Sequence, residues 1–262
     1  MYEKELEMAI YAAKEAEKII KEIYNTHFEV EIKSDDSPVT KADKEADNLM
    51  KDILHKAFPD YGFLTEESVD TDERFSKEFV WIIDPVDGTK EFVSRNGQFT
   101  TNIALARNGK IVVGIINVPM LNVLYYAVTG EGAFKLDANG NRERIHVSNR
   151  KVGELRPVKS ISHFKPEEKE FMENNTSCFG EPIEEVGAAN KFCVIAEGKK
   201  DYFIRLSNGT KEWDVASGDL IVTEAGGIMI EPNGKKFTYN RHDVYNRNGY
   251  IVCNSKENIL YK

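Results

Sequence analysis

The sequence predicts a mixed protein in which helices pack on a largely antiparallel sheet in the first half and an α/β layer follows in the second half. Three observations support this fold class. Apolar residues near the start recur at three- and four-residue intervals, β-runs joined by Asn-Gly turns come next, and strand and helix signals then alternate. With 262 residues, the chain is long enough for one large domain or two closely packed smaller ones.

Two amphipathic helices are predicted near the N-terminus. The first covers Glu3 to Tyr24, where apolar side chains recur among Lys and Glu at helical spacing. A polar loop, 34–38, leads to a second helix that opens at 39–43. Asp43 falls in the first turn or two of this helix, where the helix dipole stabilises a negative charge. A purely structural role for Asp43 is therefore an alternative to a functional one.

A central apolar run, Phe79–Ile83, predicts a strand buried on both faces. Asp84-Pro85 is expected to end this strand, because proline cannot donate a hydrogen bond to a ladder. The tight turn that follows can aim the Asp84 carboxylate, the Val86 carbonyl and the Asp87 carboxylate at one point. Three such oxygens within four residues indicate a site for a hard cation.

The residues around this turn extend the predicted site. Gly88 and Thr89 offer backbone N–H groups that suit an anion such as phosphate, so a metal and a phosphate would be neighbours. Upstream, a short strand at Phe63–Thr65 runs into two adjacent acids that begin at Glu66. Strand ends are where α/β folds place their chemistry. For the turn alone, an Asx turn that caps a helix is the alternative interpretation.

The β-runs after this turn predict hairpins. The strongest signal is the Asn-Gly turn at 108–109, which joins Thr101–Arg107 to Lys110–Asn117. Further strands are predicted at 124–128, 132–136 and 145–147. No change in composition marks a linker, and we place a soft domain boundary near Asn139. The two predicted domains are an N-terminal α+β domain, 1–138, and a C-terminal α/β domain, 139–262.

The second half alternates strands and helices, which favours an α/β layer. The predicted elements are a strand at 157–161, a helix that starts at Pro166, an extended stretch at 182–186, a helix at 191–197, a strand at 201–206, a helix at 210–225 and strands at 228–231 and 249–253. Asp214 lies at the N-terminus of the 210–225 helix. An N-cap or first-turn acid is again the structural alternative.

Composition and charge narrow the function classes. The formal net charge of -9 argues against a general nucleic-acid or membrane-surface binder. No apolar run approaches the roughly 18 residues that span a bilayer, and we expect a cytoplasmic protein. Three cysteines without C-x-x-C spacing indicate neither a disulfide framework nor a zinc knuckle. Five histidines without an H-E-x-x-H pair disfavour a zinc hydrolase.

The chain resembles the inositol monophosphatase superfamily of magnesium-dependent, lithium-sensitive phosphatases in three motifs that occur in order: Glu66-Glu67, Asp84–Thr89, and Trp213–Ala216 with Glu224–Gly227. The resemblance extends from about Thr40 to Gly227 and implies a layered αβαβα sandwich of the inositol monophosphatase and fructose-1,6-bisphosphatase type. Several segments resemble the 3'(2'),5'-bisphosphate nucleotidase branch, namely 84–92, 95–100, 102–105, 191–193, 196–198 and 212–214.

The resemblance implies two or three Mg²⁺ ions, held by Glu66, Asp84, the Val86 carbonyl, Asp87 and Asp214. Asp43 and Thr89 would orient and deprotonate the attacking water, and Glu66 would also take part in catalysis. Independently of the resemblance, four carboxylates exceed what one helix cap or turn requires, and they match metals about 4 Å apart that clamp a phosphoryl group. The N-terminal domain would then carry most metal ligands, and the C-terminal domain would complete the metal and substrate site.

The resemblance also implies substrate contacts, at Gly88, Thr89, His163, Ala188, Lys191, Arg205 and Asp214. Cations suit a substrate with a second phosphate. Ser207 stands where inositol phosphatases commonly have an acid that grips inositol hydroxyls, and Ala188 or Ala189 stands where the nucleotidase branch often has Ser. A solvated strand-end charge is the alternative for Arg205, and a role outside the substrate site stays open for His163.

We therefore expect a Mg²⁺-dependent phosphatase that converts adenosine 3',5'-bisphosphate to AMP and phosphate, with the sulfated relative of this nucleotide as a second candidate substrate. An inositol monophosphatase or a sugar phosphatase such as a fructose-1,6-bisphosphatase is the alternative within this class. A non-catalytic anion-binding module that retains the fold is the alternative from another class. The expected partner is a small phosphate compound, a nucleotide bisphosphate, rather than nucleic acid or a membrane, and a homodimer stays open.

Overall fold

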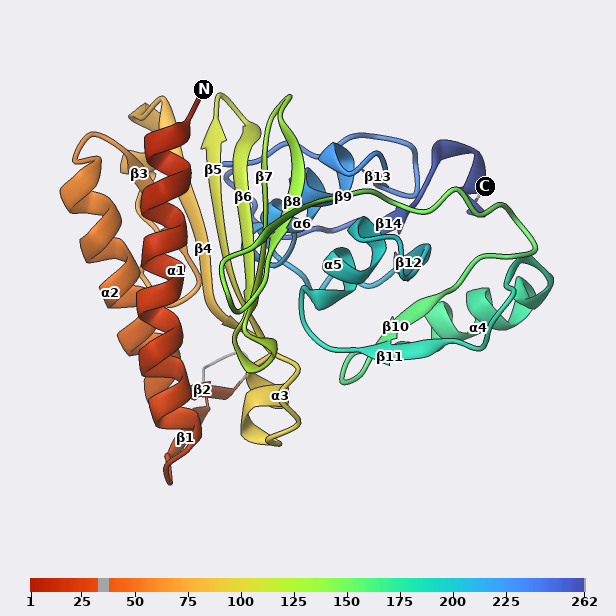
Figure 1. The fold of residues 1–262 in the computed structure, drawn as a ribbon, viewed down its shortest axis with the longest axis horizontal. Helices are drawn as coiled ribbons and strands as arrows, with labels where there is room; N and C mark the ends of the chain where they lie inside the picture. Colours follow the sequence, from red (N-terminus) through yellow and green to blue (C-terminus); the bar gives the residue numbers. More distant parts are fainter. Residues whose placement is uncertain (33–37, 262) are drawn as a thin grey trace.

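The computed structural model describes residues 1–32 and 38–261. Its helices are α1 (Glu3–Tyr24), α2 (Lys41–Ala57), α3 (Thr89–Val93), α4 (Pro166–Asn174), α5 (Asn190–Ala196) and α6 (Glu212–Glu224). In Figure 1 the layers follow one another from α1 and α2 on the left, through a large sheet, to α5 and α6, a smaller sheet and α4 on the right. This arrangement is the αβαβα sandwich that the resemblance implies.

The two predicted N-terminal helices are confirmed as α1 and α2, although α2 begins at Lys41 and not at Val39. The predicted polar loop lies largely outside the described residues, and Pro38 opens a short strand, β2 (Pro38–Thr40), which pairs with β1 (Val30–Ile32). The side chain of Thr40 caps α2, because its oxygen accepts a hydrogen bond from Ala42 N. The two helices cover one face of the large sheet, where their apolar side chains pack against β-strand residues such as Trp81.

The large sheet is seven-stranded, in the order β3-β4-β5-β6-β7-β8-β9. Its strands are β3 (Gly62–Thr65), β4 (Phe79–Asp87), β5 (Thr100–Arg107), β6 (Lys110–Val118), β7 (Val123–Val128), β8 (Gly132–Leu136) and β9 (Arg142–Ile145). Only β3 and β4 pair in parallel, so the predicted antiparallel character is confirmed. The predicted hairpin at 108–109 is also confirmed, whereas the strand predicted at 145–147 ends at Ile145 instead of starting there.

The central strand does not end at Asp84-Pro85 as predicted, because β4 continues to Asp87. Asp84 pairs with Asn102 and Asp87 pairs with Thr100, so β4 carries one more residue than β5 between these two pairs. This extra residue is a β-bulge, and a bulge tolerates proline because the ladder is already interrupted there. The bulge bends β4 at the point where the predicted metal ligands lie.

The other face of the large sheet is covered by α6, with α5 beside it. The close approach of α6 depends on Gly114 in β6, since a Cβ atom at this position would lie 2.9 Å from the Ser217 carbonyl oxygen. A Cβ atom at Gly218 would in turn lie 2.3 Å from the ring of Phe192 in α5. Two glycines therefore let the sheet and the two helices pack in contact.

Beyond these helices lies the smaller sheet, in the order β12-β14-β13, formed by β12 (Tyr202–Arg205), β13 (Ile228–Ile230) and β14 (Tyr250–Cys253). A parallel pair, β10 (Val158–Ser160) and β11 (Glu184–Val186), accompanies it. The helix α4 begins at Pro166 as predicted, and its Met172 packs with Tyr202 and Ile251 of the sheet. The predicted alternation of strands and helices in this half is confirmed.

The domain division stays a prediction. The proposed boundary near Asn139 falls in the turn between β8 and β9, which pair with each other, so the large sheet continues to Ile145. Within the described residues, no helix is both long and apolar enough to cross a membrane.

Candidate active site

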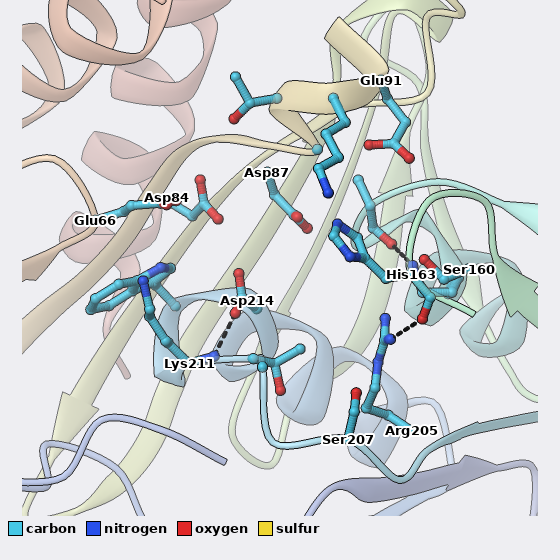
Figure 2. Close-up of a pocket in the computed structure, with 18 of the residues that line it drawn as sticks. Glu66, Asp84, Asp87, Glu91, Ser160, His163, Arg205, Ser207, Lys211 and Asp214 are labelled. Atoms are coloured by element: carbon cyan, nitrogen blue, oxygen red, sulfur yellow. Dashed lines mark hydrogen bonds between the residues drawn. The ribbon is translucent and has the colours of Figure 1, made fainter. Parts of the chain in front are cut away.

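A pocket of about 510 Å³ lies where the bulge of β4 faces the N-terminus of α6 (Figure 2). Almost every residue predicted for the site lines it, namely Glu66, Asp84, Val86, Asp87, Gly88, Thr89, His163, Ala188, Lys191, Arg205 and Asp214. Asp43 is the exception, and it lies one contact behind the wall. The structure thus brings together residues from both halves of the chain.

Three carboxylates meet at one end of this pocket. Asp84 and Asp87 come from the bulged end of β4, and Asp214 comes from the first turn of α6. Each of the three offers an oxygen atom, and these atoms all lie within 4.8 Å of one another. Figure 2 shows the three side chains converging from the two elements. This spacing and an oxygen-only donor set suit a divalent cation such as Mg²⁺.

Two of these aspartates make a local hydrogen bond to the backbone and also line the pocket. Asp84 Oδ1 accepts a hydrogen bond from Val86 N at 3.1 Å, which is the Asx turn that the sequence allowed, and Asp214 Oδ2 accepts one from Lys211 N at the start of α6. The second oxygen of Asp84, Oδ2, is buried and has no hydrogen-bond partner among the described residues. A buried carboxylate oxygen without a donor is costly, and a bound cation would satisfy it.

Electrostatics support the same conclusion. Burial raises the pKa of Asp84 well above its usual range, and the nearby charges of Glu66, Asp87 and Asp214 raise it further. Burial raises the pKa of Asp87 to about 6, and burial together with the charges of Asp87 and Glu66 raises that of Asp214 to about 8. In the absence of a cation, the cluster therefore resists full ionisation. A divalent ion would remove this repulsion.

Glu66 lies beside the cluster, at the neighbouring strand end, but it is not one of the three residues whose oxygen atoms lie within 4.8 Å of one another. Its backbone N–H donates to the Ile83 carbonyl at 3.2 Å, which extends the pairing of β3 with β4 past Thr65. Because β3 and β4 run parallel, their carboxyl ends meet at one edge of the sheet, and Glu66 lines the pocket there together with Asp84. The predicted convergence of these two strand ends is therefore what the structure has.

Asp43 and Thr89 form a contact between α2 and α3. Asp43 Oδ2 accepts hydrogen bonds from the N–H and the hydroxyl of Thr40, at 2.8 and 2.6 Å, and so completes a capping box. Its other oxygen, Oδ1, accepts from Thr89 Oγ1 at 3.2 Å. Burial raises the pKa of Asp43. One carboxylate thus caps α2 and holds the hydroxyl of a pocket residue.

The part of the pocket that we call the cationic end is lined by Lys90, Lys165, Lys191 and Arg205, and the acid Glu91 also lines it. Lys191 is buried, and its ammonium donates to the Ala188 carbonyl. Burial lowers the pKa of Lys191 to about 8, although the nearby charge of Asp87 opposes this shift. Arg205 is only 5% exposed, donates to the His163 carbonyl and lies 3.6 Å from Glu168. The alternative of a solvated strand-end charge is therefore wrong for Arg205, because the guanidinium is enclosed and paired.

The pKa of His163 reflects the positive charges at the cationic end. Burial lowers its pKa to about 4, and the positive charges of Lys90, Arg205, Lys191 and Lys165 lower it further, so the imidazole is neutral at pH 7. Sequence reasoning missed Lys90 and Lys165, which line the pocket with the predicted cations. Lys90 could have been found, because it directly follows the Asp84–Thr89 motif, but no sequence signal points to Lys165.

The structure also decides between two alanines. Ala188 lines the pocket, whereas Ala189 is buried and does not. Ala188 has a positive φ of 49° and lies opposite Gly88, where a Cβ atom would be 3.1 Å from the Ala188 Cβ. Gly88 itself has a φ of 89°, which favours glycine. The predicted role of a glycine at the turn thus has a second reason in the packing of the two pocket walls.

The fold and the site define a phosphatase. The chain matches the model of the inositol monophosphatase family over residues 1–260, and it belongs to this family. It is 36% identical over 251 residues to the 3'(2'),5'-bisphosphate nucleotidase CysQ of Salmonella typhimurium. The aligned region covers 94% of this chain and 98% of that protein.

Solved structures of this family have the same fold as this chain. CysQ of Bacteroides thetaiotaomicron superposes with a TM-score of 0.84 at 31% identity, over 97% of this chain and 98% of that one. An inositol monophosphatase of Thermotoga maritima gives a TM-score of 0.81 at 29% identity, over 96% and 92% of the two chains. The predicted family and the layered sandwich are both confirmed, and the chain is an enzyme of the phosphatase class.

Proposed function

We propose that this protein is a Mg²⁺-dependent 3'(2'),5'-bisphosphate nucleotidase that converts adenosine 3',5'-bisphosphate to AMP and phosphate, with the sulfated relative of this nucleotide as a second substrate. One observation carries the proposal: a single pocket is lined both by an oxygen-only cluster of carboxylates and by a group of cations. The similarity to CysQ proteins supports the same substrate class.

The carboxylate end would hold the metal. Asp84, Asp87 and Asp214 supply oxygens at suitable spacing, and the Glu66 carboxylate and the Val86 carbonyl line the same part of the pocket. The unpartnered Asp84 Oδ2 fits such an occupant. Bound Mg²⁺ lowers the pKa of a water molecule and neutralises charge that develops on the phosphoryl group.

The chain's own proton path would run through Thr89. Its hydroxyl is held by Asp43 Oδ1 at 3.2 Å and by the Val86 carbonyl at 3.3 Å, which orients Oγ1. When Thr89 Oγ1 takes a proton from the attacking water, its own proton passes to Asp43 Oδ1, so the pair acts as the general base. The raised pKa of Asp43 favours this transfer, because a more basic carboxylate is a better proton acceptor.

The cationic end would bind the phosphate that does not react. Lys191 and Arg205 line this end, and Lys90 and Lys165 add to its field. Charge-assisted hydrogen bonds from such groups are among the strongest contacts to phosphate. A monophosphate without a second anion would not make these contacts. Ser207, which also lines the pocket, adds no negative charge there, in contrast to the acid that inositol phosphatases commonly have at that position.

The test is parallel turnover at fixed Mg²⁺ on adenosine 3',5'-bisphosphate, inositol 1-phosphate and fructose 1,6-bisphosphate, with phosphate release as the readout. We expect the highest kcat/KM for the nucleotide and no release in EDTA. Fructose 1,6-bisphosphate is the sharper comparison, since it also carries two phosphates but no nucleoside. A higher kcat/KM for either competitor would contradict the proposed substrate, and no turnover of any would favour a non-catalytic anion-binding module.

A further inference from the structure

Glu168, in the first turn of α4, is a buried carboxylate that connects two segments of the pocket wall. It is 1% exposed and does not line the pocket itself. Its Oε2 accepts a hydrogen bond from Lys165 N at 3.0 Å, and its Oε1 accepts one from Leu206 N at 3.1 Å. One side chain thus joins the loop before α4 to the end of β12.

The same carboxylate holds Arg205. Glu168 Oε1 lies 3.6 Å from Arg205 Nη1, and this guanidinium also donates to the carbonyl of His163, in the loop that Glu168 fixes. These contacts form a ring. Glu168 contacts Arg205, Arg205 contacts the loop that contains His163, and Lys165 N of the same loop donates to Glu168. In Figure 2, Arg205 extends from the strand end towards His163.

A helix-capping role alone does not account for these contacts. A capping box requires one carboxylate oxygen, and the bond from Lys165 N to Oε2 satisfies it. The second oxygen contacts Leu206 N and Arg205, which belong to a different element. Two ions enclosed at this depth are stable only as a pair, so the position of one depends on the other.

We propose that Glu168 is a positioning residue that sets the specificity of the pocket for a second phosphate, by fixing the Arg205 guanidinium and the His163–Lys165 loop at the cationic end. This inference rests on the proposed function. Glu168 does not touch the substrate. It acts through the geometry of the residues that do, so its removal weakens binding of the second phosphate and leaves the reacting phosphate in place.

The experiment compares Glu168→Gln with wild type on two substrates that share the nucleoside and the reacting phosphate, namely adenosine 3',5'-bisphosphate and adenosine 3'-monophosphate. Glutamine keeps the size of the side chain but loses the charge that pairs with Arg205. We expect KM for the bisphosphate to rise about tenfold or more, with kcat nearly unchanged and KM for the monophosphate changed less than about twofold. The inhibition constant of AMP, which keeps the 5'-phosphate, should rise in parallel.

Glu167→Gln is the matched control, because Glu167 is the adjacent acid in the first turn of α4 and is exposed. It should leave every parameter at the wild-type value. In an Arg205→Ala background, Glu168→Gln should add a smaller selective loss than it causes in wild type, because one of the two groups through which it acts is already gone. Should Glu168→Gln fail to fold, Glu168→Asp keeps the charge with a shorter reach and should still raise KM for the bisphosphate selectively.

Three results would overturn the inference. Equal losses on both substrates would show that Glu168 is only structural, and an unchanged KM for the bisphosphate would show that Arg205 does not need it. A selective loss that persists undiminished in the Arg205→Ala background would show that it acts elsewhere. If wild type hydrolyses both substrates with equal kcat/KM, the second-phosphate site fails together with the inference. If the wild-type preference is intact and Glu168→Gln keeps it, only the inference fails.

Discussion

Thr89 Oγ1 lies 3.2 Å from Asp43 Oδ1, and this contact joins the start of α3 to the first turn of α2. Because Thr40 occupies the other oxygen of Asp43, Oδ1 is the oxygen that would accept the proton in the proposed path. We expect Thr89→Ala to lower kcat by roughly 10²–10⁴-fold with little change in KM. Steady-state phosphate release from adenosine 3',5'-bisphosphate measures this effect.

Thr89→Ser is the control for this prediction, since it keeps a hydroxyl that Asp43 can hold. Its kcat should stay within about tenfold of wild type. If Thr89→Ala leaves kcat unchanged, the Thr89 hydroxyl takes no part in the proton transfer.

Asp87→Asn should abolish Mg²⁺-dependent phosphate release while the fold remains intact. The amide keeps the acceptor for Asn102 but removes one negative charge from the cation site. In EDTA at pH 8, the variant should be more stable than wild type by on the order of 1 kcal/mol, because burial disfavours the charged form of Asp87. Circular dichroism melts and calorimetric Mg²⁺ titrations measure these two effects, and turnover at saturating Mg²⁺ would contradict the assignment.

The carboxylate cluster of the metal-free protein should contribute less stability as pH rises from about 4 to about 8, whereas the lowered pKa of His163 acts in the opposite direction up to about pH 6.5. Asp87 and Asp214 have raised folded pKa values, of about 6 and about 8, so at these two residues the folded state binds more protons than the unfolded state across this range. Their contribution to the free energy of unfolding is fully present below the pKa of the unfolded state and is lost as pH rises through the pKa values of the folded state. Melting in EDTA at several pH values measures it, and Mg²⁺ should flatten the profile, because the ion binds the ionised carboxylates. Equal pH slopes with and without Mg²⁺ would count against a metal at these residues.

Li⁺ should inhibit the enzyme at fixed Mg²⁺. A small monovalent cation can replace a weakly held ion in an oxygen site without supplying the same charge. Phosphate release across a Li⁺ series, with Na⁺ at equal ionic strength as the control, measures this effect. Activity that is indifferent to millimolar Li⁺ would set this chain apart from the lithium-sensitive superfamily that its motifs resemble.

Arg205→Ala should lower kcat/KM on adenosine 3',5'-bisphosphate by roughly 10- to 150-fold, the effect of losing a charge-assisted contact, and barely change that on adenosine 3'-monophosphate. Arg247→Ala is the control, since Arg247 is exposed and pairs with Asp243 on the surface. Truncation also leaves Glu168 buried without its partner, so a lower melting temperature should accompany the selective loss. Equal losses on both substrates would mean that Arg205 does not read the second phosphate.

Local patterns predicted most of the elements, because helical spacing and turn chemistry are written into neighbouring residues. The helices α1 and α2 and the hairpin at 108–109 follow from such patterns. The end of β4 did not, since the rule that proline stops a strand holds only where the ladder is regular. Whether Pro85 ends β4 or lies in a bulge depends on the pairing partner, which a single segment does not specify.

The sequence by itself determined the family and the acids of the candidate site, because Glu66, Asp84, Asp87 and Asp214 occur in motifs whose order and spacing are specific. Only the tertiary structure decided how the carboxylates share their oxygens between capping and the pocket, and which cations gather in the same pocket. The pairing of Arg205 with Glu168 joins the end of a strand to a helix that precedes it in the chain, and such contacts depend on how the layers pack. Packing brings together charged residues that lie far apart in the sequence, so the fold determines which charges line the pocket.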